Sequence, residues 1–243
     1  MLFTHPTLTT DSWTLYIKAS VLISRVRSFN SRFRISVVTR GSGISALSHE
    51  SPAESEEFHH LDQTIAAFTR NIPRALRDPV GTAVDPLLYT AHLLPHVAMI
   101  QLYDPHAKPE SPNDHSTVQM LAATRAILDL IYKLCGTTYD LLYMDHSCSV
   151  AWFLAGAAII RFLKAKIAAK DDDEVARLEQ ELGIVKFMLR NLGDRTIIGH
   201  RQVNVLQGLY NVEIRGHGRK AATAPSATDQ RAETDNLIFG NMK

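Results

Sequence analysis

The sequence predicts an all-α protein, built as a single bundle of about six to seven helices, and three observations lead to this fold class. Apolar residues recur at steps of four and three from Leu15 to Phe33, which is the spacing of one helix face. Five or six later segments also read as helices, and no segment reads as a convincing strand. The chain has 243 residues, of which 45% are hydrophobic, so it can bury a substantial core as one domain.

Apolar periodicity and turn-forming residues divide the chain into three parts. We expect residues 1–10 to form an N-terminal extension and residues 11–215 to form the helical domain. Apolar periodicity is lost after residue 215, so we expect residues 216–243 to be a disordered tail.

The first helix is expected to begin at Asp11 or Ser12, either of which can cap free backbone N–H groups, and to end near Phe33. Its first half carries apolar residues outside the main stripe. We therefore expect this half to be covered on more than one side. The additional apolar residues are Trp13, Tyr16, Ile17 and Ile23.

Capping residues, prolines and glycines predict the bounds of the remaining helices. A serine-rich and glycine-containing stretch at 41–52 is expected to be a loop, and Pro95 is expected to kink its helix. The second helix should bury Phe58, Leu61, Ile65 and Phe68. Helices are expected at 53–69, 86–103, 113–136, 149–169, 171–193 and from 194 to about 210, with a short one at 139–144.

Charge and hydropathy bear on the partners of the chain. A formal net charge of +1 gives no global field that would gather nucleic acid. The most apolar run, at 150–160, is shorter than the roughly 20 residues of a membrane-spanning helix. We expect it to lie in the buried central helix, and we expect no membrane partner. The first residues lack the basic start and apolar run of a secretory signal.

Five arginines between residues 25 and 40 form the main basic stretch. Arg25 and Arg32 fall on one edge of the apolar stripe, whereas Arg27 and Arg34 fall about 160° away on its other edge. One nucleic-acid groove would therefore not receive all four. We expect these residues, with Arg40 further on, to flank and shield a core seam.

Histidines and cysteines are the other candidate chemical groups. His92 and His96 have the spacing of two zinc ligands, but Pro95 lies between them and no third ligand is evident. We expect Cys135 and Cys148 to be free, small core residues. Phosphate loops, dinucleotide motifs and calcium loops are absent from the sequence, so we predict no catalytic, cofactor or metal residues.

Three stretches of the chain resemble recurrent blocks of the middle homology, or regulatory, region of fungal zinc-cluster transcription factors. They occur in the same order and at similar intervals as in that family, and the resemblance extends over about residues 11–210. The stretches are DSWTLYIKA (11–19) leading into RVRSFN (25–30), FHHLDQTI (58–65) followed by Phe68 and Pro73, and AHLLPHVAMIQLYDP (91–105).

The resemblance implies a nuclear, all-helical regulatory domain without enzyme activity. In the family, an N-terminal cluster of six cysteines holds two zinc ions and contacts DNA. The two cysteines of this chain do not supply that cluster, so we expect zinc and direct DNA contact to lie outside these residues. A truncated gene product, a gene model without its start and a regulator without its own DNA reader are all consistent with the sequence.

We therefore expect a regulatory module that controls transcription through protein contacts, self-association or sensing of a small apolar effector. A pocket for such an effector is expected between the third, fifth and sixth helices, with His92, Gln101 and Trp152 as candidate lining residues. A helical enzyme for an apolar substrate and a pure interaction scaffold are the alternatives. The enzyme alternative predicts paired acidic clusters on facing helices.

Overall fold

The computed structural model describes residues 3–6, 9–41, 53, 55–194 and 196–216. Within these residues the chain is helical and has no strand, which confirms the all-α bundle. The predicted loop at 41–52 and the predicted tail at 216–243 lie outside the described residues except for Gly41 and Gly216. Gly41 is not in the loop but is the last residue of α1. The α-helices are α1 (Ser12–Gly41), α2 (Glu56–Arg70), α3 (Pro86–Tyr103), α4 (His115–Cys135), α5 (Ser147–Ala169), α6 (Asp172–Gly193) and α7 (Ile197–Tyr210).

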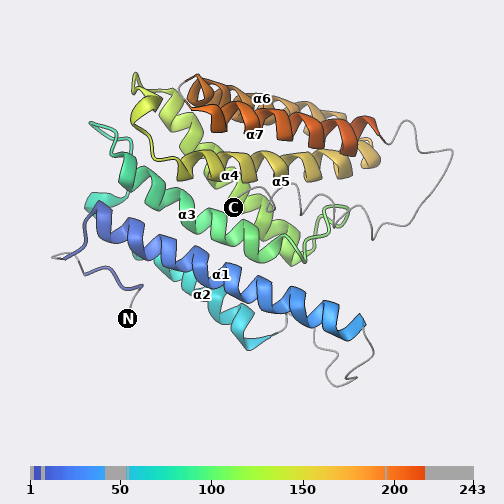
Figure 1. The fold of residues 1–243 in the computed structure, drawn as a ribbon, viewed down its shortest axis with the longest axis horizontal. Helices are drawn as coiled ribbons and strands as arrows, with labels where there is room; N and C mark the ends of the chain where they lie inside the picture. The colour runs from blue at the N-terminus through green and yellow to red at the C-terminus, as the bar shows by residue number, and fades with distance from the viewer. Residues whose placement is uncertain (1–2, 7–8, 42–52, 54, 195, 217–243) are drawn as a thin grey trace.

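The helices form two groups that meet along α3, α4 and α5. Figure 1 shows α1, α2 and α3 together on one side of the molecule and α5, α6 and α7 together on the other. Helix α3 packs against α1, α2, α4 and α5, while α5 also packs against α4, α6 and α7. One continuous hydrophobic core therefore runs through both groups.

Helix α1 begins as predicted but ends later. The Asp11 side chain accepts a hydrogen bond from the Thr14 backbone N–H at 2.7 Å, which caps the helix. The predicted end near Phe33 is wrong, because the helix continues to Gly41. Residues 34–40 contain neither proline nor glycine, so no breaker stops the helix earlier.

The expectation that α1 is covered on more than one side in its first half is wrong for two residues. Trp13 is 56% exposed and Ile17 is 46% exposed, whereas Ile23 is buried. Leu15, Ala19 and the rest of the predicted stripe as far as Phe29 are buried, and Phe33 is partly buried. The described neighbours α2 and α3 thus leave the opposite face of α1 open.

Helix α2 confirms its predicted buried stripe of Phe58, Leu61, Ile65 and Phe68. It begins at Glu56, after the predicted start, because the Ser55 side chain caps it through the Phe58 N–H. The described N-terminal residues pack against its end: His5 Nε2 lies 3.1 Å from the Phe68 carbonyl oxygen.

Helix α3 has the predicted bounds, and α4 lies within its predicted range of 113–136. Asp85 and Asp114 cap their N-termini, and Gly136 follows the end of α4. Helix α3 continues through Pro95. Leu121 of α4 is only partly buried. The short helix predicted at 139–144 is a single 3-10 turn, η3 (Leu141–Tyr143), and a second such turn, η2 (Arg74–Leu76), precedes α3.

Helix α5 is the central buried helix that the sequence predicts. Its length and a mean hydropathy of 1.5 would suffice for a membrane span, but 72% of that window is buried inside the bundle. Trp152 is fully buried there. Helix α5 thus contacts protein on most of its surface.

Helix α6 is capped by Asp171 as predicted, but α7 does not begin at Asp194. Asp194 instead ends α6, with its N–H bonded to the Arg190 carbonyl, and α7 begins at Ile197. Gly199 allows a close helix approach: a Cβ there would meet the Leu189 carbonyl oxygen and lie 2.6 Å from the Gly193 nitrogen.

Gly199→Ala is expected to destabilise the protein by about 1–3 kcal/mol, because backbone atoms must move to admit the methyl group. Gly183→Ala is the matched control, since a Cβ on Gly183 of α6 meets no atom within 4 Å. That control should stabilise the helix by about 0.5–1 kcal/mol. Urea unfolding of both variants measures the difference, and equal effects would contradict the close approach of α7 to α6.

Candidate functional site

The three predicted pocket residues do not come together. His92 Nε2 lies 2.8 Å from the carbonyl oxygen of Leu76, in the turn η2. The carbonyl of Gln101 accepts a hydrogen bond from Asn30 of α1 at 2.7 Å. Gln101 follows His92 by nine positions, which is two and a half turns of helix, so the two residues lie on opposite sides of α3. The structure therefore does not form the predicted pocket around this trio.

Trp152 lies in a buried polar cluster between α3 and α5. Its indole nitrogen and the Tyr89 hydroxyl are both buried, and neither forms a hydrogen bond. The nearby indole acts to lower the pKa of Tyr89, but burial has the larger effect and raises that pKa. Thr90 Oγ1 lies 3.2 Å from Cys148 Sγ, and burial raises the pKa of that thiol to about 12. Such a thiol is a core group and not an activated nucleophile.

The prediction that Cys135 is a core residue is wrong. Both cysteines are free, as predicted, but Cys135 is exposed at the end of α4, whereas Cys148 is buried. Within the described residues, no group of three or more histidine, cysteine, aspartate or glutamate side chains could hold a metal ion.

A charged network joins α4 and α6, and sequence reasoning missed it. Arg125 of α4 pairs with Glu174 of α6 at 3.1 Å, and Arg177 of α6 approaches Glu174 and Glu181. Asp129 adds a further negative charge near Glu181, and burial raises the pKa of the Glu181 carboxyl. Carboxylates on facing helices are what the enzyme alternative predicts, but here arginines lie among them and neutralise them.

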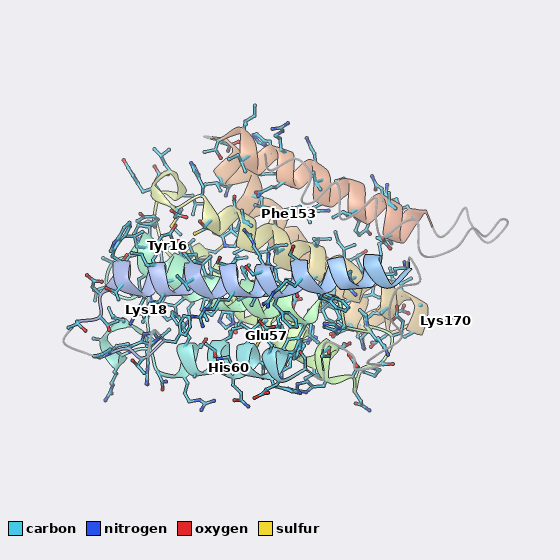
Figure 2. The ribbon with its side chains drawn as sticks, turned by 60° about the horizontal axis from the view of Figure 1, so that its bottom comes forward. Tyr16, Lys18, Glu57, His60, Phe153 and Lys170 are labelled. Carbon is cyan, nitrogen blue, oxygen red and sulfur yellow. The ribbon has the colours of Figure 1, made fainter. Side chains whose placement is uncertain are left out.

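The outward face of α1 is an exposed surface that carries two apolar residues. We define it as Trp13, Ile17, Ser20, Ser24, Arg27 and Ser31, which are all exposed. An open hollow of about 530 Å³ lies over the later part of this face and does not include Trp13 or Ile17 in its lining. It is lined by Ser20, Ile23, Ser24, Arg27, Ser28, Ser31 and Arg32. Figure 2 shows α1 across the front of the molecule, with Tyr16 and Lys18 labelled on it.

Arg25 and Arg32 lie beside the buried stripe of α1, as predicted, whereas Arg27 does not shield that stripe and lies on the outward face. The Arg25 guanidinium lies 5.1 Å from the centre of the Phe3 ring, and Arg32 forms a salt bridge with Glu57 of α2. Arg27 lines the hollow. The side chains of Arg34 and Arg40 lie outside the described residues. The face is therefore made of two apolar residues, three serines and one cation, a composition suited to contact with protein.

Comparisons of the chain with protein-family models, with curated proteins and with solved structures found no match.

Acidification below pH 6.5 is expected to destabilise the protein through His96. Burial lowers the pKa of His96 to about 4 and also lowers the pKa of His92. The unfolded chain then binds protons more readily than the folded chain as the pH falls from 6.5 to 4, so stability is lost through that window. We expect a loss of about 2 kcal/mol between pH 7 and pH 5 from His96 alone.

Urea unfolding of the wild type and of His96→Gln at several pH values measures this dependence. The variant should have a shallower loss of stability below pH 6.5 than the wild type. His60→Gln is the control, because the exposed His60 side chain meets water in the folded protein as it does in the unfolded one. A wild-type slope in the His96 variant would contradict the assignment.

Proposed function

We propose that this chain is a regulatory domain of a fungal-specific transcription factor, and that it controls transcription through protein contacts. The zinc cluster that would read DNA is not among its residues, and the domain would work in the nucleus on a DNA-binding partner or segment. The observation that carries the proposal is the packing of the three stretches that resemble the family's regulatory region.

Those three stretches lie on α1, α2 and α3 and pack against one another. Phe58 of the second stretch meets Phe29 of the first, with ring centres 6.1 Å apart. It also meets Tyr103 of the third stretch at 5.1 Å, in an edge-to-face arrangement. Asn30 and Gln101 form a hydrogen bond that links the first stretch to the third. A shared set of helix-packing blocks is expected to assemble in this way if the resemblance reflects a common domain.

Contact with protein is favoured over sensing of a small apolar effector as the mode of control. The outward face of α1 presents an exposed tryptophan and an exposed isoleucine on a rigid helix. Exposed apolar side chains that cluster on one face are typical of interaction surfaces. The residues expected to line an effector pocket are instead distributed over both sides of α3 and over α5.

A transcription reporter tests this function. Residues 1–243, fused to a heterologous DNA-binding domain in a fungal cell, should change the reporter output relative to that DNA-binding domain alone. Phe58→Asp should abolish the effect, because it places a charge between the three helices. Phe187→Ser on α6, where the side chain is exposed, is the matched control and should retain the effect. An unchanged output from the intact fusion, with the protein present and folded, would contradict the proposal.

A further inference from the structure

A strap, which we define as residues 3–6, contacts both α1 and α2 without belonging to a helix. The Phe3 ring lies edge-on to the Phe68 ring of α2, with ring centres 6.4 Å apart. The Arg25 guanidinium of α1 lies 5.1 Å from the centre of the same Phe3 ring. His5 is buried, which is uncommon for a polar residue of an irregular segment. The strap therefore has a defined place at the junction of the two helices.

His5 attaches the strap to the C-terminal end of α2. Its Nε2 lies 3.1 Å from the Phe68 carbonyl oxygen, and the two rings lie edge-on with centres 4.6 Å apart. That carbonyl belongs to the last turn of α2, where carbonyls lack an intrahelical N–H donor. A carbonyl only accepts, so Nε2 carries the ring hydrogen and Nδ1 of the neutral ring carries none. Nδ1 is buried and meets no hydrogen-bond partner among the described residues.

We propose that the neutral imidazole of His5 holds the strap on α2, and that uptake of a proton by His5 releases the strap while the helices stay folded. The proton would add an N–H donor at Nδ1, where burial excludes water and no acceptor is in reach. It would also place a positive charge on a buried ring. Both effects favour the imidazolium in water over the imidazolium beneath the strap.

The charges around the strap act in the same direction. From α1 it meets two cations, because Arg25 lies over Phe3 and Lys18 donates a hydrogen bond to the Thr4 carbonyl at 2.7 Å. From α2 it meets the uncharged Phe68. Burial is the main cause that lowers the pKa of His5, and Lys18 lowers it further, whereas the bond to the Phe68 carbonyl acts to raise it.

The direction of this shift fixes the direction of the switch. A released His5 has the ordinary histidine pKa of about 6.5, and the docked His5 binds its proton less readily. Docking is therefore complete above pH 6.5 and is lost as the pH falls below it.

Release of the strap is a local event with a consequence for the surface. The Phe68 side chain is fully buried when the strap is docked, and two of the described contacts on it come from Phe3 and His5. A segment with so few contacts can open without unfolding of the domain. Release thus uncovers aromatic surface at the end of α2. This inference goes beyond the proposed function, since it holds with or without a role in transcription.

Nuclear Overhauser effects between aromatic rings in the full chain test the switch. The effect between Phe3 and Phe68 measures docking of the strap, and the effect between Phe29 and Phe58 is the control for packing of α1 on α2. Nitrogen chemical shifts of His5 report its protonation. We expect both effects at pH 7.5, and loss of the Phe3–Phe68 effect alone once His5 is protonated.

Two variants separate His5 from other titrating groups. His5→Gln has no imidazole to protonate, so its Phe3–Phe68 effect should not change between the two pH values. His5→Lys carries a charge at both, so it should lack that effect at pH 7.5 and keep the Phe29–Phe58 control. Persistence of the Phe3–Phe68 effect in the wild type with protonated His5, or in His5→Lys, overturns the proposal. So does its loss together with the control, or its loss on acidification of His5→Gln.

Discussion

The burial of α3 between the two groups of helices is the constraint on which the rest of the fold depends. This helix buries apolar side chains around most of its circumference, and it packs against α1 and α2 on one side and against α4 and α5 on the other. Arg161 of α5 holds its C-terminal end, through the Asp104 carboxylate and the Ala107 carbonyl. Each large apolar side chain buried here contributes about 1.5–3 kcal/mol, so displacement of α3 would remove the main packing partner of both α1 and α4.

Periodicity and capping residues sufficed to predict α3, α4 and α6, because their ends carry strong local signals such as Asp114, Gly136 and Asp171. The end of α1 was placed too early, because the apolar stripe stops at Phe33 whereas the helix continues to Gly41, the first breaker after it. The start of α7 was also misjudged, because Asp194 can cap a following helix or end a preceding one, and tertiary packing around Gly199 decides between them. Local sequence does not encode that packing.

The candidate site was less predictable than the fold. Counting nine residues from His92 to Gln101 would have placed them on opposite sides of one helix. The exposure of Trp13 and Ile17 had no such signal, because a pattern identifies apolar residues but not which of them a neighbour covers. The charged network between α4 and α6 joins residues about fifty positions apart, such as Arg125 and Glu174, and only the packing of the helices brings them together.

A packed core centred on α3 and an open face on α1 together describe a domain that acts through contact. The core holds α1 rigidly along its buried stripe, and the opposite stripe then presents its side chains at fixed spacing. Native-state hydrogen exchange tests the central claim most directly. The amides of Leu93 and Val97 in α3 should exchange only through global unfolding. Their exchange through a smaller opening than that of the amides in α6 would contradict the account.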